Sequence, residues 1–546
     1  MARLFVIEAP GKARTFASIL KELGEEVVVQ ATVGHLFGLP DRLDPVGVDR
    51  AYRDFARVPL KIDVCERLRR EAGLADEVVI ATDADQEGDV IAWDVATLVR
   101  DMHPAPLRMR LKGMDKESVR EALSSLGPVL KRDAVAGRTR AIVDRLIGAA
   151  FTKDGVPVGR ISTAMLGMVA AQKPGTSTLR LVAPSKDNGR PYTAECPVEG
   201  IVTPAIAEAL AKFTLPPIGP KSSAPLEEHP GHTGDIMVRC GDELDVSPAE
   251  AGRRLQRNYE AGTLSYPRAG SRAFSPMVAA KMAEVLRKAG YGAAKAETFP
   301  PKPEGDVHDA LYPIGKVDLA SDPRKLDEDA GVRAVVARGV ARAGVRRTRE
   351  FGLAQPLWAF LVAKAIPQDV ADKVVALDWT RDVGPRVPGQ QSFPESAVVQ
   401  RRADTVLLER AIEAGLGRPS TWGNHVERFM SRGLVGDDLS LTAKGRRWHA
   451  ASPPMLLDPR ISAAIEQACE RFPGGMMDDP DREPWELNAE RIATRLPQSI
   501  REPMRALTEP EAPRRRIDPI SEYGLDRDFV AEAAELGRPA YAPRAD

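Results

Sequence analysis

The sequence predicts a multidomain protein of mixed α/β and α+β class, with a parallel, doubly wound sheet in its N-terminal domain. The chain has 546 residues, too many for a single hydrophobic core. Strand-like apolar runs alternate with helix-like segments over about the first 125 residues, which is typical of a parallel sheet. Helical and strand-rich blocks then follow one another along the rest of the chain.

The N-terminal domain takes its strands from short apolar runs: RLFVI (3–7), EVVVQAT (26–32), EVVIAT (77–82) and LRMRL (107–111). A helix is predicted from Ala13 to Leu23, where Gly24 is suited to end it. A second helix follows the third strand, and Asp115 is placed to cap a third.

Beyond residue 133 the pattern is helical, and between 176 and 243 it is strand-like. Ser247 and Glu250 have the spacing of a capping box before SPAEAGRRLQRNYEAG, and Ser275–Pro276 opens another helix. Strand-like segments return after residue 366, DKVVALDW (372–379) among them, and helices follow from 404 to the 470s. The last 70 residues or so are rich in Pro, Arg and acids, which predicts a loosely packed tail.

The composition is that of an ordinary globular protein, 43% hydrophobic and 28% charged. No apolar run is long enough to span a bilayer, and no charged, hydrophobic leader follows Met1. We therefore expect a cytoplasmic protein without a membrane partner. The four cysteines lie far apart, so neither a disulfide framework nor a CxxC zinc pair is expected.

The net charge of −1 is unevenly distributed, because residues 100–160 hold 13 Lys and Arg against 7 Asp and Glu. A nucleic-acid groove needs only a local field of this kind, since contacts to phosphates act within a Debye length of about 8–10 Å. A solvated helical face explains the same excess. The charge permits a nucleic-acid partner without requiring one.

The stretch ATDADQEGDVIAWD (81–94) sets Asp83, Asp85 and Glu87 at alternating positions behind an apolar strand. Like charges so close together are unfavourable unless they are solvated or joined by a cation. Glu8 ends the first predicted strand, at the same sheet edge. Mg²⁺ takes one or two carboxylates and keeps several waters. These residues favour a Mg²⁺ site over the alternative, an acidic turn that caps the next helix.

In VIEAPGKARTF (6–16), Lys12 lies near a helix N-terminus, where backbone N–H groups favour anions. A solvated lysine in an ordinary turn is the alternative. The phosphate-binding pattern GxxxxGK[ST] is absent from the sequence, so ATP-driven chemistry is not expected.

LFVIEAPGKARTF, TVGHLFGLP and IATDADQEGDVIAW resemble, in order and spacing, the Toprim domain that opens type IA DNA topoisomerases. Further stretches resemble later motifs of that family. TRAIVDRLIG and VGRISTAML are similar to its helical segments after Toprim, and GTLSYPRAGSRAFS to its active-site tyrosine motif. HDALYPI is similar to its histidine motif, and GRPSTWGNHVERFMSRGLV to its late helical motif. The matches run from about residue 3 to 445.

The resemblance implies an enzyme that cleaves one DNA strand through a 5′-phosphotyrosine, passes a strand and reseals the break, with Mg²⁺ and without ATP. It would relax negative supercoils or decatenate DNA. Tyrosine and arginine suit that chemistry, because a phenol can attack phosphorus and a guanidinium can bind the same phosphate. The implied catalytic residues are Tyr266, Glu8, Lys12, Arg268 and His308. The expected DNA-binding residues are Arg160, Arg138, Arg140, Arg145, Ser420, Thr421 and Trp422, with Trp422 as a stacking surface. The expected metal ligands are Glu8, Asp83, Asp85 and Glu87.

The resemblance also implies a toroidal core with a Rossmann-like Toprim domain. The expected parts are Toprim 1–132, a helical DNA-binding segment 133–175 and 401–475, a β-rich arch 176–243 and 351–400, an active-site tyrosine domain 244–350 and a tail 476–546. The expected partner is DNA, above all single-stranded or underwound DNA. The chain is expected to be a monomer, with the tail open to an unidentified protein partner.

The sequence departs from the family at Gln86, where an arginine is usual, and at Asp309 and Tyr312 in the histidine motif. Gly270 stands where an acid often follows the tyrosine motif, and no cysteine-rich zinc ribbon follows the core. These departures leave two alternatives open. One is a Toprim metal-dependent nuclease or primase-like enzyme, and the other is a non-catalytic relative that binds single-stranded DNA.

Overall fold

The computed structural model describes residues 2–111, 113–153, 155–303, 308–388 and 395–510. The chain divides into two compact units. The first unit contains residues 1–167, 260–262 and those from 449 onward, and the second contains 168–259 and 263–448. No helix in the described ranges is both long and apolar enough to cross a membrane.

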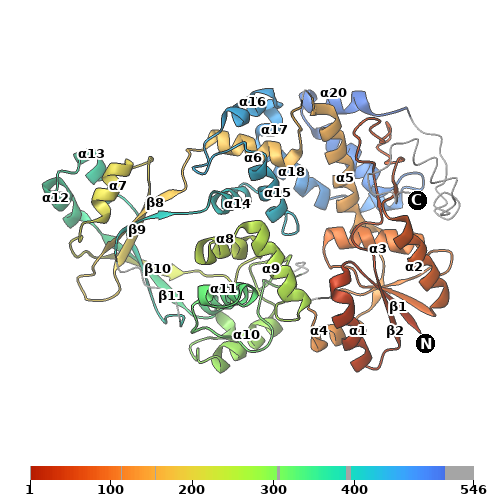
Figure 1. Ribbon diagram of the computed structural model, residues 1–546, viewed down its shortest axis with the longest axis horizontal. Helices are drawn as coiled ribbons and strands as arrows, with labels where there is room; N and C mark the ends of the chain where they lie inside the picture. The colour runs from red at the N-terminus through yellow and green to blue at the C-terminus, as the bar shows by residue number, and fades with distance from the viewer. Residues whose placement is uncertain (1, 112, 154, 304–307, 389–394, 511–546) are drawn as a thin grey trace. The chain divides into compact units, whose positions relative to one another are not determined.

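The first unit contains the predicted parallel sheet, with strand order β2-β1-β5-β6-β7 (Figure 1). Its strands are β1 (Arg3–Ile7), β2 (Val27–Ala31), β5 (Glu77–Ile80), β6 (Leu107–Arg108) and β7 (Gly127–Pro128). All neighbouring pairs are parallel except β6 and β7. A separate short pair, β3 (Phe37–Gly38) and β4 (Val58–Pro59), is antiparallel. The sheet confirms the α/β class of the N-terminal domain, although LRMRL forms a much shorter strand than its sequence suggests.

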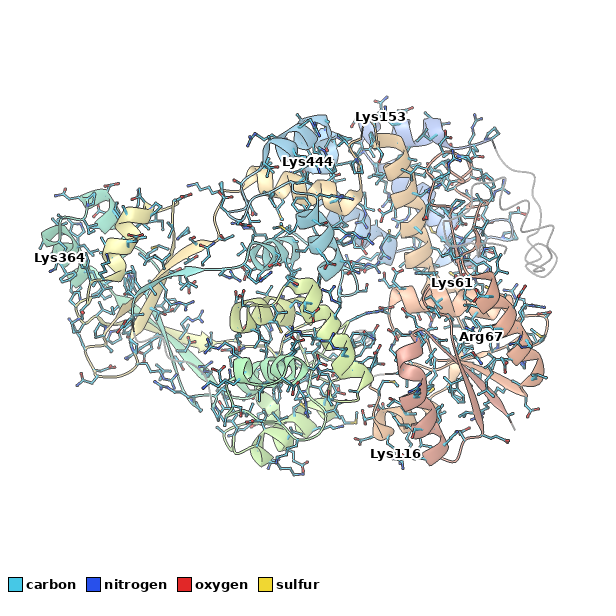
Figure 2. The ribbon with its side chains drawn as sticks, viewed as in Figure 1. Lys61, Arg67, Lys116, Lys153, Lys364 and Lys444 are labelled. Atoms are coloured by element: carbon cyan, nitrogen blue, oxygen red, sulfur yellow. The ribbon has the colours of Figure 1, made fainter. Side chains whose placement is uncertain are left out.

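Helices cover both faces of this sheet, because the buried strand residues alternate between the two faces. The helices are α1 (Ala13–Glu22), α2 (Ile62–Leu74), α3 (Gln86–Leu98) and α4 (Lys116–Ser124), with a short 3₁₀ turn η1 (Pro10–Lys12) before α1. Phe5 contacts Phe16 of α1, whereas Leu4 and Val6 share a core with α2 and α3. Lys116, labelled in Figure 2, pairs with Glu22 at 2.9 Å and joins α4 to α1.

A second core of the first unit forms around α5 (Lys131–Phe151). The other helices of this region are α6 (Arg160–Ala171, which runs into the second unit), α17 (Pro454–Leu457), α18 (Pro459–Glu470), η4 (Gly474–Asp478), α19 (Pro484–Arg495) and α20 (Gln498–Leu507). Trp485, Ile492 and Ile500 are buried against Leu146 and its neighbours on α5.

The expectation of a loosely packed tail is therefore wrong for residues 484–509. The apolar residues of α19 and α20 recur at helical spacing. The overall composition of this segment, rich in Pro and Arg, does not reveal that spacing. Glu509 closes this region, because its N–H donates to Val48 O at 3.1 Å and its carbonyl accepts from Arg50 N at 3.0 Å. Residues 511–546 of the expected tail lie outside the described residues.

The second unit contains a six-stranded sheet of order β10-β11-β12-β9-β8-β13, antiparallel at each neighbouring pair. Its strands are β8 (Ser177–Ala183), β9 (Tyr192–Pro197), β10 (Gly219–Leu226), β11 (Arg347–Leu353), β12 (Thr380–Val383) and β13 (Ala397–Gln400). The sheet thus joins two segments that are far apart in the sequence. Helices α7 (Pro204–Ala211), α12 (Gln355–Ala363) and α13 (Gln368–Val375) share its core.

The strand expected at DKVVALDW is wrong over its first half, which belongs to α13. Val370, Ala371 and Val374 are buried at helical spacing, and this periodicity outweighs the β-propensity of the valines.

The remaining elements of the second unit are helical: α8 (Thr233–Leu244), α9 (Pro248–Glu260), α10 (Pro276–Lys288), η2 (Ala296–Thr298), η3 (Pro323–Lys325), α11 (Glu328–Ala343), α14 (Ala403–Glu413), α15 (Trp422–Ser431) and α16 (Ala443–Ala451). The last residue of α9 and the last three of α16 belong to the first unit. The predicted starts of α9 and α10 are confirmed. Ser247 Oγ accepts from Glu250 N at 3.2 Å, and Pro276 opens α10. The reciprocal half of the box is replaced, because Glu250 pairs with Arg253 and Arg254.

Candidate active site

The acidic stretch forms a tight loop between β5 and α3. Ala81 N donates to Val6 O at 2.7 Å, so the loop leaves the sheet beside the end of β1, close in sequence to Glu8. Asp85 caps α3, its Oδ1 accepting from Gly88 N at 2.8 Å. A Cβ at Gly88 would lie 1.9 Å from Asp83 O, so only glycine allows the backbone to fold back here. Asp85 thus caps the helix through one carboxylate oxygen, and its part in a metal site stays a prediction.

Lys12 and Asp83 form an ion pair between the loops that follow β1 and β5. Lys12 is 2% exposed and Asp83 is 5% exposed. The alternative of a solvated lysine is wrong, because η1 turns the side chain inward. Burial makes each charge dependent on the other, since an unpaired charge in this environment is costly.

Arg108 of β6 fixes the backbone of the same acidic loop, a role that the sequence did not reveal. Its guanidinium donates to Thr82 O at 2.7 Å and to Asp83 O at 2.8 Å, and pairs with Asp89 at 3.1 Å. Despite that pair, burial raises the pKa of Asp89 above its ordinary value. The available signal was an arginine within the apolar strand LRMRL.

Glu87 lies against His35, with 2.9 Å between Oε2 and Nε2. Burial disfavours the imidazolium, but the hydrogen bond to Glu87 and the charges of Glu87 and Asp94 prevail and raise the pKa of His35. The contacts of the three acids thus differ: Asp83 pairs with a lysine, Asp85 caps a helix, and Glu87 contacts both His35 and, at 3.8 Å, Arg140.

A divalent metal fits the chemistry of this loop, because its carboxylates are oxygen donors and Mg²⁺ needs only one or two of them. Across the described ranges, however, no three His, Cys, Asp or Glu side chains are grouped so that they could hold one ion. The expected cluster of four ligands is not assembled in this arrangement.

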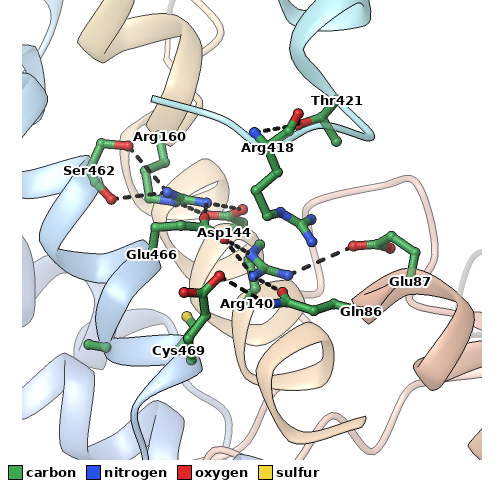
Figure 3. A network of polar contacts seen from close by, with 12 residues as sticks. Gln86, Glu87, Arg140, Asp144, Arg160, Arg418, Thr421, Ser462, Glu466 and Cys469 are labelled. Carbon is green, nitrogen blue, oxygen red and sulfur yellow. Dashed lines mark hydrogen bonds and ion pairs between the residues drawn. The ribbon is translucent and has the colours of Figure 1, made fainter. Parts of the chain in front are cut away.

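Behind the loop, a buried carboxylate joins two arginines (Figure 3). Glu466 of α18 is 8% exposed. Its Oε1 accepts from Arg140 Nε at 2.9 Å, and its Oε2 from Arg160 Nη2 at 2.9 Å. Arg160 also pairs with Asp144 at 2.7 Å. This carboxylate was not anticipated, since nothing in the local sequence around it indicates a buried acid.

Gln86 connects this network to the acidic loop. Its Oε1 accepts from Arg140 Nη2 at 2.5 Å, and its Nε2 donates to Glu470 at 3.0 Å. An arginine at position 86 would bring a second cation to Arg140. The neutral amide therefore suits this chain, because its oxygen can accept from Arg140 without adding a charge.

Arg138, Arg140 and Arg145 are each at most 9% exposed and have internal partners, so DNA would have to compete for them, and their contact with DNA stays a prediction. Arg138 pairs with Asp54 at 2.7 Å and lies 4.4 Å from the ring centre of Trp485. Arg145 donates to backbone carbonyls, among them that of Pro40 at 2.7 Å.

Arg160 is 4% exposed, so a DNA phosphate would have to compete with Asp144 and Glu466 for its guanidinium. Its contact with DNA stays a prediction.

In the second unit, two segments hold the loop that carries Tyr266. Ser265 N donates to Tyr312 O at 3.0 Å, and Tyr312 N donates to Ser265 Oγ at 3.0 Å. On the other side, Thr233 Oγ1 donates to Pro267 O at 2.7 Å, and Thr233 N to Ala269 O at 3.1 Å. The tyrosine and histidine motifs are thus joined through their backbones.

Tyr266 stacks against His308, with ring centres 4.6 Å apart and planes at 30°. Tyr259 meets the same ring edge-on at 5.6 Å, and Tyr266 is only 3% exposed. Arg268 lies two residues further on and is half-buried. The fold therefore brings together Tyr266 and His308, which the motifs only suggested.

The departures in the histidine motif have structural partners. The Asp309 carboxylate accepts from Ser275 N at the start of α10 and lies 4.0 Å from Lys302. Tyr312 packs edge-on against Phe274, 6.0 Å between ring centres.

Trp422 is buried in this structure, so stacking of bases on its ring stays a prediction. The residue is 8% exposed, its Nε1 donates to Leu416 O at 2.8 Å, and its ring lies 5.0 Å from that of His232. Thr421 Oγ1 contacts Arg418 O at 3.3 Å, and Ser420 is half-buried. DNA binding by Ser420 and Thr421 stays a prediction.

Comparison with known proteins identifies residues 3–113 as a Toprim domain. The chain is 27% identical to reverse gyrase 2 of Aeropyrum pernix over 69% of its own length and 34% of that protein. It is 22% identical to DNA topoisomerase 1 of Synechocystis over 42% of that protein. The chain thus spans less than half the length of these two relatives.

A shorter relative, DNA topoisomerase 1 of Aquifex aeolicus, is 23% identical over 79% of this chain and 87% of that protein. The structure of topoisomerase I from Thermotoga maritima superposes with a TM-score of 0.58 at 17% identity, covering 93% of this chain and 90% of the other. This likeness shows that the two proteins share a fold. The chain thus carries a Toprim domain, is homologous to bacterial DNA topoisomerase I of type IA and has the fold of that enzyme.

Proposed function

We propose that this protein is a DNA topoisomerase of type IA that cleaves, passes and reseals single DNA strands without ATP. The observation that carries the proposal is the placement of Tyr266 against His308, on a loop whose backbone is held from two sides. A nucleophile needs this fixed orientation, because misplacement of the reacting group lowers the rate steeply. The Toprim domain and the homology to topoisomerases support the same reaction.

In the proposed reaction, the Tyr266 oxygen forms a bond to phosphorus while the bond from phosphorus to the 3′ oxygen breaks. The phenolic proton leaves to water, and Glu8 supplies a proton to the departing 3′ oxygen. Arg268 and His308 stabilise the charge on the phosphate. The 5′-phosphotyrosine keeps the bond energy, so resealing reverses the same steps and needs no ATP. Because Tyr266 is buried, an opening motion precedes the attack.

Asp83, Asp85 and Glu87 are the residues that would hold Mg²⁺. When bound, the ion would stabilise charge on the DNA backbone and orient it for resealing. Lys12 balances the charge of Asp83 and keeps the loop after β5 close to the loop after β1. We further propose single-stranded or underwound DNA as the substrate, a monomeric enzyme and a cytoplasmic location.

Relaxation of negatively supercoiled plasmid, with and without Mg²⁺ and in the absence of ATP, tests the proposal. The wild-type protein should relax the plasmid stepwise, and Tyr266→Phe should abolish both relaxation and the covalent DNA adduct. Tyr259→Phe is the matched control, since it removes the hydroxyl of the neighbouring ring and should retain activity. Nicking that survives in Tyr266→Phe would indicate a Toprim nuclease. Binding without any change of linking number would indicate a non-catalytic relative.

A further inference from the structure

A basic surface lies on α15, the start of α16 and the turn between them, and its residues all belong to the second unit. It consists of Arg428, Arg432, Lys444, Arg446 and Arg447, and we call it the α15–α16 surface. Within the described part of the chain, none of these five cations has an acidic partner at ion-pair distance. In contrast, Arg401 on the neighbouring segment pairs with both Asp242 and Glu409.

The scaffold beneath this surface is tightly packed. Trp448 is 7% exposed, with Arg432 at 5.9 Å and Lys444 at 5.2 Å from its ring centre. Lys444 Nζ donates to Arg432 O at 2.8 Å, which ties α16 to the end of α15. A Cβ at Gly445 would lie 2.0 Å from Leu434 O, so α16 rests directly on the turn. The positive charges are therefore carried on a framework with little freedom to move.

The remaining three arginines, Arg428, Arg446 and Arg447, are exposed. Lys444, which is labelled in Figure 2, lies on α16 and is exposed as well. The carboxylates between residues 428 and 448 are those of Asp437 and Asp438 in the turn. For a chain with a net charge of −1, five cations without acidic partners among the described residues are a local concentration that favours a polyanion.

We propose that the α15–α16 surface binds the phosphate backbone of duplex DNA, which makes it a second nucleic-acid contact besides the cleaved single strand. Proteins that hold single strands stack the bases on exposed aromatic rings, but here the aromatic ring is buried beneath the cations. Contacts to phosphates alone suit a duplex, which presents a high and regular density of charge. This inference rests on the proposed function and assigns the surface to the duplex that flanks the cleaved strand.

The test is a triple variant, Arg428→Ala/Arg446→Ala/Arg447→Ala, which leaves the packing of Arg432 and Lys444 on Trp448 intact. Lys212→Ala/Lys221→Ala/Lys325→Ala is the matched control, because it removes the same charge from exposed, scattered positions of the same unit. Fluorescence anisotropy measures binding to a blunt duplex and to one of its single strands over a series of KCl concentrations.

The slope of log affinity for the duplex against log salt concentration should fall by about 2 to 3, at roughly 0.9 for each phosphate that the variant no longer neutralises. Single-strand affinity and the slope of the control variant should change little. The charge-preserving variant Arg428→Lys/Arg446→Lys/Arg447→Lys should keep most of the duplex affinity, which separates the effect of charge from any effect on folding.

Three results would overturn the inference: unchanged duplex binding, an equal weakening for single strands and duplex, or an equal weakening in the control variant. Cleavage of a single-stranded oligonucleotide by the wild-type protein is scored in parallel. If the oligonucleotide is not cleaved while the duplex effect persists, the proposed function fails and the surface assignment stands.

Discussion

The carboxylate of Glu466 provides the most direct test of how the first unit is held together. It is 8% exposed and accepts hydrogen bonds from Arg140 and Arg160, which are 5% and 4% exposed. Glu466→Ala would leave two buried guanidinium groups without their shared carboxylate. Burial makes this change costly, because water cannot replace the missing partner.

Removing one partner of a buried ion pair costs about 3–5 kcal/mol. Here the cost should fall near the lower end, at about 3 kcal/mol, because both arginines keep other partners. Arg160 keeps Asp144 at 2.7 Å, and Arg140 keeps Gln86 at 2.5 Å. For a unit of this size, one kcal/mol corresponds to a shift of about 2–4 °C in Tm. The expected decrease in Tm is therefore about 6–12 °C.

Differential scanning calorimetry of the full chain measures this shift, since separate transitions are expected for a protein with two units. Glu470→Ala is the control, because Glu470 lies one turn later on α18 and its contact with Gln86 is exposed. Glu466→Gln, which keeps an acceptor oxygen but removes the charge, should lie between wild type and Glu466→Ala. If Glu466→Ala melts within about 1 °C of Glu470→Ala, which corresponds to less than about 0.5 kcal/mol, the reasoning is wrong.

Three further predictions concern the loop and the C-terminal helices. Gly88→Ala should abolish plasmid relaxation, because the added Cβ would lie 1.9 Å from Asp83 O. Gly127→Ala is the control and should retain relaxation, because open space surrounds that position. Equal activity of the two variants would contradict the loop geometry. Burial raises the pKa of Glu486 to about 7, so its contribution to stability is complete below the ordinary value near 4.5 and is lost as pH rises through 7. In thermal unfolding between these pH values, Glu486→Gln should lose that dependence, and an unchanged pH profile would refute the assignment. Asp83→Ala/Asp85→Ala should impair relaxation more than formation of the covalent adduct, and an equal effect on both would argue against a metal that acts in resealing.

The sequence alone was sufficient for the features that depend on neighbouring residues. The strands of the Toprim sheet are marked by short apolar runs, and the caps at Asp115 and Ser247 by the residue types that accept a backbone N–H. The position of Asp83 at the carboxyl end of β5 follows from the order of strand, loop and helix. Tyr266 and His308 were identified from motifs, and each motif consists of a few neighbouring residues.

Only the tertiary structure decided which charged side chains are buried and paired. Arg138 and Arg140 were expected at a DNA surface from the family resemblance, but their partners, Asp54 and Glu466, lie far away in the sequence. Trp422 was expected to be available to bases and is instead buried against His232. Local charge and residue type determine what a side chain can bind. The fold determines whether another part of the chain binds it first, because burial makes an internal partner the alternative to solvent.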